Sequence, residues 1–326
     1  MPDPYLHEHF GADVLEALSG EITDSIDKGV FSRALQGPDP WSAIGFLGGK
    51  YKKYANRSAI MHKQKTGEFL RSCAEMAKED QSSLLFSYLC GFVCHYCLDK
   101  STHPYIIAKS GEYEGTQETY AYRGLHTRLE RALDCLYIRQ KYKRTPWHFC
   151  IPRETYKAKK YPIDLKEPID RLYSTVYGWE DGYALSNVSL RYEALFYRLM
   201  QDPLGIMHYL FRPISNKKTD YCVFSYYKRD ADAKLIDYQN DAHAQWTHPY
   251  DTNTVSCESF EELYSKAKSE ALYILSKTHG YVFSKEDTDL NELFSNQSYC
   301  TGLDCDDPRH NNTPVYSPIN YPNRYF

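Results

Sequence analysis

The side chains of greatest chemical interest in this sequence are histidines and carboxylates, which gather in the first 130 residues. Imidazole nitrogens and carboxylate oxygens are metal ligands of borderline to hard character, and this mixture suits zinc with about four ligands to each ion. Eight candidate ligands would serve two or three zinc ions. They are His7, Asp39, His62, His95, Asp99, His103, His126 and Glu130.

The spacing of His95 and Asp99 carries the clearest signal. Residues 84–98 contain no charged side chain, so we expect a buried helix from Ser82 to about Asp99, with the two side chains one turn apart on one face. A carboxylate at the C-terminal end of a helix meets the negative end of the helix dipole, which predicts a cation beside Asp99. A metal ion meets this expectation, and Asp99 could bridge it to a second ion. An ordinary buried hydrogen bond between His95 and Asp99 is the alternative.

His126 and Glu130 repeat this spacing on the apolar face of a helix that we predict over residues 116–141. A glutamate on such a face must be protonated or meet a cation, which is either a metal ion or one of two nearby arginines. Pro104 disfavours helical geometry at the residue before it, which is His103. We therefore expect the imidazole of His103 to leave the end of its helix and to reach a different ion.

Three further candidates complete the set. His62 lies on the apolar stripe of a helix predicted over residues 56–78, so its ring should point inward, either as a ligand or as a hydrogen-bonded core histidine. Asp39 stands between two prolines in a rigid turn, which holds its carboxylate at little entropic cost. His7 and His9 alternate along the chain, so in an extended segment both would face one side and one could be a ligand.

Helical periodicity dominates the rest of the chain and predicts an all-α fold, a multi-helical bundle around a polynuclear zinc site. We expect the first 215 residues to form the helical domain that carries the ligands. Residues 216–326 are interpreted as a loop-rich extension, packed on the same domain, with one late helix at about 260–278. The other predicted helices cover residues 12–28, 165–179, 187–201 and 203–211.

Composition excludes several classes of protein. A mean hydropathy of −0.62 with 25% charged residues argues against a polytopic membrane protein, and 42% hydrophobic residues argue against general disorder. The net charge of −4 disfavours a nucleic-acid binder. The N-terminus lacks the basic start and apolar run of a secretory signal, so we expect a cytoplasmic protein with reduced cysteines.

Several short motifs resemble the zinc-dependent phospholipase C family, whose helical fold is related to that of the fungal single-strand zinc nucleases. The motifs follow the family's order. They are Leu6-His7-Glu8-His9-Phe10-Gly11, Gln36-Gly37-Pro38-Asp39-Pro40, Met61-His62, the segment from Gly91 to Asp99, His103-Pro104-Tyr105-Ile106, and the segment from His126 to Glu130.

The resemblance implies a division of the ligands among three zinc ions. Asp39, His62 and His95 would hold one ion, and Asp99 would bridge it to a second ion held by His7. His103, His126 and Glu130 would hold the remaining ion. The secreted archetypes of the family also use an N-terminal Trp, whereas this chain begins Met1-Pro2, so either His9 replaces the Trp or that site is weak or empty.

The activity implied by the resemblance is hydrolysis of the glycerol–phosphate ester of a phospholipid by zinc-bound hydroxide, with Asp39 able to accept a proton from the attacking water. Such a substrate implies transient contact with a membrane surface. One alternative is a zinc nuclease or a phosphodiesterase for soluble diesters, and the net charge of −4 weighs against the nuclease. An alternative of another class is a binding protein that zinc stabilises without catalysis.

Overall fold

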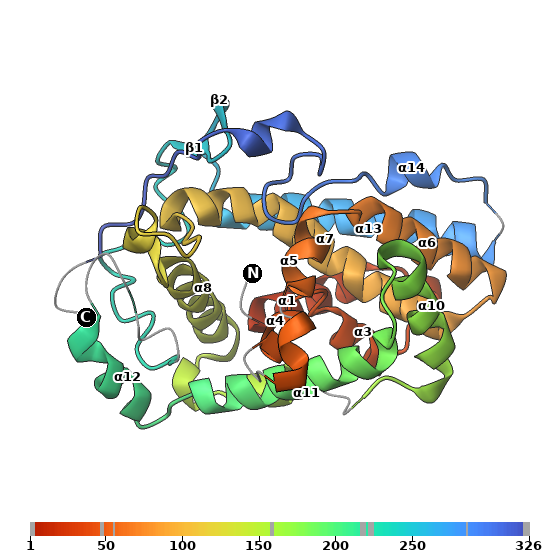
Figure 1. The fold of residues 1–326 in the computed structure, drawn as a ribbon, viewed down its shortest axis with the longest axis horizontal. Coiled ribbons are helices and arrows are strands. Elements are labelled where there is room, and N and C mark those ends of the chain that lie inside the picture. Colours follow the sequence, from red (N-terminus) through yellow and green to blue (C-terminus); the bar gives the residue numbers. More distant parts are fainter. Residues whose placement is uncertain are drawn as a thin grey trace.

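Helices build almost all of the regular structure of this chain, as the sequence predicts (Figure 1). A computed structural model describes residues 4–45, 49–54, 56–156, 160–215, 220, 225–284 and 286–321. The α-helices are α1 Pro4–Ala17, α2 Gly20–Asp24, α3 Lys28–Ala34, α4 Pro40–Gly45, α5 Arg57–Lys63, α6 Thr66–Glu79, α7 Ser83–Ser110, α8 Leu125–Tyr142, α9 Ile151–Thr155, α10 Lys166–Tyr177, α11 Gly182–Met200, α12 Ile206–Phe211, α13 Phe260–Phe283 and α14 Leu290–Leu293.

Short 3-10 helices and one small sheet complete the regular structure of the described residues. The two strands, β1 Trp246–His248 and β2 Asp251–Ser256, pair antiparallel. They form in a segment that the sequence marks as loop-rich. The 3-10 helices are Gly49–Tyr54, Tyr120–Tyr122, Pro146–His148, Ile163–Leu165, Arg212–Ile214 and Pro308–Asn311.

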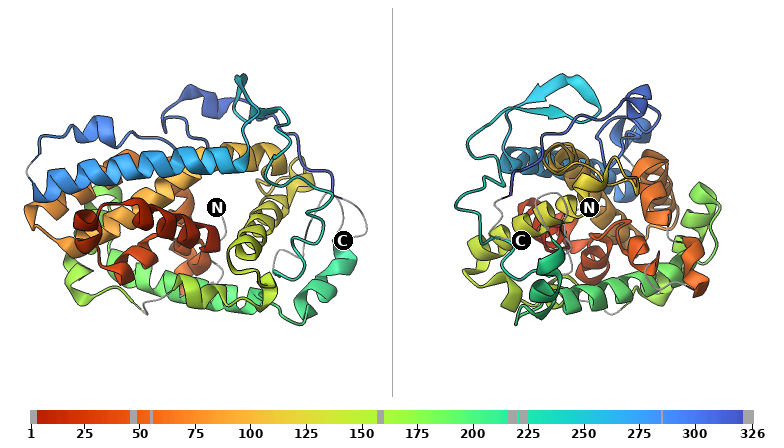
Figure 2. Two further views of the ribbon diagram at one scale, coloured as in Figure 1. Left: turned by 180° about the vertical axis from the view of Figure 1, so that it is seen from behind. Right: turned by 60° about the vertical axis from the view of Figure 1, so that its left-hand side comes forward.

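Helix α7 is the central element of the fold. The late helix α13 packs along it, α1, α3 and α6 pack against its other faces, and α11 covers the opposite side of the molecule (Figures 1 and 2). Its side chains are buried over almost the whole length. Within the described residues no helix is both long and apolar enough to cross a membrane.

The prediction that this helix ends near Asp99 is wrong. The Ser82 hydroxyl accepts a hydrogen bond from the Leu85 amide at the start of α7, and the helix runs through Pro104 to Ser110. Burial on all sides outweighs the amide hydrogen bond that proline removes. Asp99 therefore lies inside the helix, and the argument from the helix dipole does not apply to it.

Other boundaries also differ from the predictions. The expected helix over 56–78 is two helices, α5 and α6, separated at Lys65, whose φ of 55° is left-handed. The helix expected at 12–28 is replaced by α1, which starts at Pro4, and by α2, whereas α8 starts nine residues later than predicted. The late helix begins at the expected capping box of Ser259 and Glu262 but continues past Gly280.

A glycine sets the closest approach between α7 and α3. A Cβ atom on Gly91 would lie 2.5 Å from the Cβ of Ala34 and 2.7 Å from the carbonyl oxygen of Phe31. These neighbours belong to backbone or to a short side chain, so they cannot rotate away. The approach matters for function because α3 leads directly into the turn that carries Asp39.

We predict that Gly91→Ala lowers the free energy of unfolding by about 1–3 kcal/mol, because the added methyl group overpacks the contact between α3 and α7. Alanine would stabilise an open helical position by up to about 1 kcal/mol, so the sign of the change is diagnostic. Urea denaturation followed by circular dichroism measures it. Gly20→Ala is the matched control, since a Cβ there has no neighbour within 4 Å; equal effects of the two changes would contradict the prediction.

Candidate metal centre

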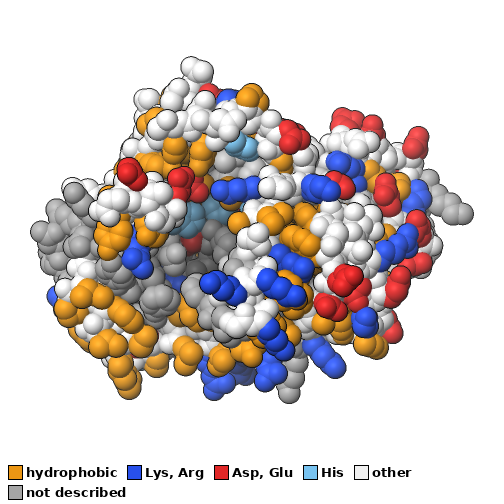
Figure 3. Space-filling model, viewed as in Figure 1, with side chains coloured by type: hydrophobic (Ala, Val, Ile, Leu, Met, Phe, Trp, Pro, Cys, Tyr) orange, Lys and Arg blue, Asp and Glu red, His pale blue; other side chains and the backbone are white. Residues whose placement is uncertain are grey.

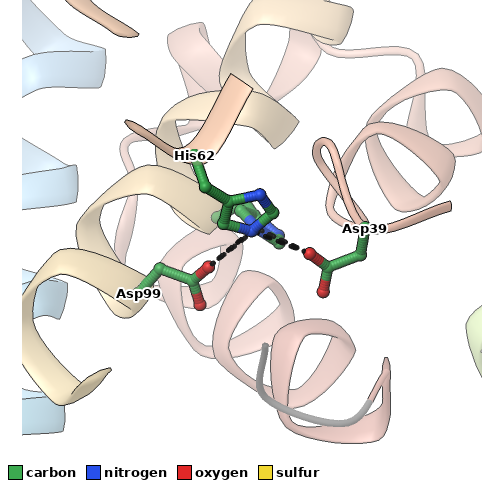
Figure 4. Close-up of side chains that lie close together, drawn as sticks. Asp39, His62 and Asp99 are labelled. Carbon is green, nitrogen blue, oxygen red and sulfur yellow. Dashed lines mark ion pairs between the residues drawn. The ribbon is translucent and has the colours of Figure 1, made fainter. Parts of the chain in front are cut away.

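Three elements bring four of the predicted ligands together (Figure 4). Asp39 lies in the turn between α3 and α4, His62 lies in the last turn of α5, and His95 and Asp99 lie one turn apart on α7. One ligand atom from each residue lies within 4.8 Å of the others, and all four side chains are buried. The positions fit the sequence spacing, although the helix that places His62 is shorter than predicted.

The distances within this group match those between the ligands of one zinc ion. Nε2 of His62 lies 3.0 Å from Oδ1 of Asp39 and 3.6 Å from Oδ2 of Asp99. Nε2 of His95 lies 3.0 Å from the same Asp99 oxygen and 3.7 Å from the same Asp39 oxygen. Bonds of about 2.0–2.2 Å in a tetrahedral arrangement place ligand atoms roughly 3.3–3.6 Å apart.

Backbone carbonyl groups determine which imidazole nitrogen faces the carboxylates. Nδ1 of His62 donates to the Ser58 carbonyl at 2.7 Å, and Nδ1 of His95 donates to the Leu35 carbonyl at 3.0 Å. In a neutral ring the other nitrogen, Nε2, then carries a lone pair. Lone pairs aimed at carboxylate oxygens repel them unless a cation lies between, so this arrangement fits a metal ion.

His7 adds a fifth ligand to this group. Its Nε2 lies 3.5 Å from Oδ1 of Asp99 and 3.9 Å from Oδ2 of Asp39, and its ring stacks on that of His95 with centroids 4.0 Å apart. Burial, together with the neighbouring His95, lowers the pKa of His7 to about 3. The ring is therefore neutral, and neither of its nitrogens has a hydrogen-bond partner. Asp99 faces His7 with one oxygen and His95 with the other, which is the geometry of a bridging carboxylate.

The N-terminal segment is not extended, because His7 and His9 lie on helix α1. Two residues along a helix turn the chain by about 200°, so the two rings point to different sides. His9 lies 3.7 Å from Asp13 and 3.0 Å from the Lys141 ammonium, away from the ligand group. His9 is therefore not a replacement for the N-terminal Trp of the archetypes.

A second group combines His103, His126 and Glu130. Nε2 of His126 lies 2.8 Å and Nε2 of His103 lies 3.5 Å from Oε1 of Glu130. His103 stays in α7, one turn beyond Asp99, so the expectation that it leaves the helix is wrong, although the structure does place it with the second group. The side chain of His126 is 26% exposed, so this group is open to solvent on one side.

The electrostatics of the first group call for a cation. Burial would raise the pKa of the Asp99 carboxyl, but His95, His103 and the other imidazoles around it hold that pKa well below its usual value. Burial likewise opposes charge on His62, yet the adjacent Asp39 and Asp99 carboxylates raise the pKa of His62 to about 9. Both shifts show that the site favours positive charge between the imidazoles and the carboxylates.

A loop near the C-terminus, which no sequence motif marks, holds the ligands in place. The Tyr299 carbonyl accepts a hydrogen bond from Nδ1 of His103 at 2.9 Å, and its amide donates to the His62 carbonyl at 2.9 Å. The Ser298 hydroxyl donates to the same carbonyl at 3.2 Å. The Tyr299 ring packs against His62 and His95, with centroids 5.4 and 5.7 Å away. Because backbone groups make most of these contacts, no residue type in this loop marks its role.

Fold and site together define a helical protein with two buried or partly buried groups of side chains suited to metal ions. Residues 38–183 match the family model of zinc dependent phospholipase C, which supports the assignment to that family made from the motifs. The matched segment contains every candidate ligand except His7. No curated protein and no solved structure matches the chain.

We predict that zinc binding at pH 7 releases protons. In the metal-free protein His62 is protonated at neutral pH because its pKa is about 9, and the bound ring must be neutral. The apparent zinc affinity should therefore rise with pH up to about 9. Titration calorimetry in buffers of different ionisation enthalpy measures the proton count, and binding without proton release would contradict the assignment of His62.

We also predict that Tyr299→Ala weakens zinc binding by roughly tenfold, although Tyr299 is not a ligand, because the change removes the ring that packs on His62 and His95. Competition with a chromogenic chelator measures the affinity. Tyr299→Phe keeps the ring and should bind zinc as the natural chain does. An unchanged affinity in a folded Tyr299→Ala protein would show that the loop does not position the ligands.

Proposed function

We propose that this chain is a zinc-dependent hydrolase of the phospholipase C type, which cleaves the glycerol–phosphate ester of a phospholipid. One observation carries the proposal: α7 alone presents His95, Asp99 and His103 to both ligand groups, which places the two groups side by side. Adjacent metal ions are the arrangement that phosphodiester hydrolysis uses. The family match points to the same chemistry.

The second ligand group is accessible from solvent through His126. Figure 3 shows a hollow on the face that carries α8 and α11, with histidine and acidic side chains at its floor. The partial exposure of His126 agrees with this view. A structural zinc site is normally closed by four protein ligands, whereas a catalytic site leaves a position for water or substrate. The three ligands of the second group, one of them partly exposed, fit the catalytic pattern.

Zinc bound by these residues would lower the pKa of a coordinated water and neutralise charge on the phosphoryl oxygens. Within the protein, Asp39 is the residue suited to accept the proton of the attacking water. It stands in a tight turn, its Oδ1 has no hydrogen-bond donor, and its side chain is 6% exposed. Asp99 and Glu130 are more deeply enclosed between imidazoles, so their role is to bind the metal ions.

Substitution of the proposed base separates catalysis from metal binding. We predict that Asp39→Asn retains an oxygen ligand but lowers kcat by roughly 10²–10⁴-fold, as expected when a general base is lost. His95→Ala should lose both zinc and activity. Metal content by plasma mass spectrometry and diacylglycerol release from phosphatidylcholine are the measurements, with a single-stranded DNA substrate in parallel.

The natural chain also tests the proposal. A zinc-loaded preparation that cleaves single-stranded DNA but no phospholipid would favour the nuclease. If it cleaves neither substrate, the zinc ions stabilise a binding protein. Full phospholipid hydrolysis by His95→Ala would show that the catalytic centre lies elsewhere.

A further inference from the structure

An unusual group of apolar side chains is exposed at the end of α11 and around α12. Six aliphatic residues within 20 positions are each between 51% and 76% exposed. Contiguous exposed apolar surface in a soluble domain commonly marks an interaction site. We define the α12 patch by these residues, which are Leu195, Leu199, Leu204, Ile206, Leu210 and Ile214.

Hydrogen bonds to Asp202 hold helix α12 in place, with its apolar side chains facing outward. None of the six residues of α12 is buried. The carboxylate of Asp202, itself only 6% exposed, accepts hydrogen bonds from the amides of Met207 and His208 at 3.2 and 2.9 Å and from the Ser225 hydroxyl at 2.7 Å. The helix is therefore fixed through its first turn, which leaves Ile206 and Leu210 free for contacts outside the chain.

The charges around the patch favour an anionic or zwitterionic lipid surface. Asp202 is the only carboxylate between residues 194 and 215, and its hydrogen bonds keep it inside. Arg198 and Arg212 are exposed among the aliphatic side chains. Within residues 194–215, exposed aliphatic side chains and arginines without an exposed acid complement the boundary between acyl chains and phosphate headgroups.

The patch is also connected to the candidate metal centre. Nη2 of Arg131 donates to the sulfur of Met200, which ties the end of α11 to α8, the helix of His126 and Glu130. Figure 3 shows hydrophobic side chains on the rim around α12 on the same face as the hollow with the histidines. The α12 patch and the hollow therefore lie on one face of the molecule.

We propose that the α12 patch docks the protein on a phospholipid bilayer and so presents the hollow to lipid headgroups. The aliphatic side chains enter the headgroup layer, and Arg198 and Arg212 contact phosphate groups. This proposal rests on the proposed function for its choice of a lipid surface, because a phospholipase must meet its substrate in an aggregate. The surface itself lies after the segment that matches the family model.

Vesicle flotation tests the docking surface directly. Zinc-loaded full-length protein is mixed on ice with vesicles of phosphatidylcholine and phosphatidylserine, and the bound fraction is measured for the natural chain and for the triple variant Leu204→Ser, Ile206→Ser, Leu210→Ser. We expect at least about tenfold weaker binding of the variant, because binding scales with the apolar area that enters the bilayer. Ile163→Ser is the matched control, since Ile163 is 68% exposed beside α10, outside the patch.

A second measurement distinguishes this proposal from the proposed function. Hydrolysis of dihexanoyl phosphatidylcholine below its critical micelle concentration needs no bilayer, so the triple variant should retain the rate of the natural chain. If vesicle binding falls in the variant while neither protein hydrolyses any lipid, the docking surface stands and the proposed function fails. Equal vesicle binding by variant and natural chain, or a natural dimer that the variant converts to monomers, would overturn the proposal.

Discussion

Burial of the Asp99 carboxylate imposes an electrostatic demand that several helices meet together. A fully buried negative charge costs several kcal/mol unless cations and hydrogen bonds compensate it. Asp99 has no exposed surface, and neither of its oxygens accepts a hydrogen bond. The surrounding groups are four imidazoles from three helices, α1, α5 and α7. A positive charge beside Asp99 therefore stabilises the packing of several chain segments at one site.

Helix α7 contributes ligands to both groups and so links them. Its residues at positions 95, 99 and 103 follow each other at one-turn intervals, so one rigid element contributes to both ligand groups. The other ligands come from α1, α5, α8 and the turn before α4, and both α1 and α8 pack against α7. Rigid support of this kind holds the ligand atoms in a fixed arrangement, which metal ions that act together require. The close contact at Gly91 brings α3 against α7, and α3 leads into the turn that places Asp39 beside Asp99.

The sequence predicted the helical class and the ligand pairs with local spacing, because His95 with Asp99 and His126 with Glu130 depend only on the pitch of a helix. It failed where distant packing overrides local preference. Pro104 should end a helix, yet burial on all sides carries α7 through it. His9 looked equivalent to His7 until helix α1 turned it away from the site. The hydrogen bond from His103 to the Tyr299 carbonyl joins residues 196 positions apart, and no short-range pattern records such a contact.

The loop around Tyr299 also has a consequence for the order of events during synthesis. Every candidate ligand lies in the first 130 residues, but the groups that orient His62 and His103 come almost at the end of the chain. While a ribosome is still adding the C-terminal third, the ligands exist without the backbone that aligns them. The two ligand groups therefore reach their final alignment only after the C-terminal loop has packed against α5 and α7.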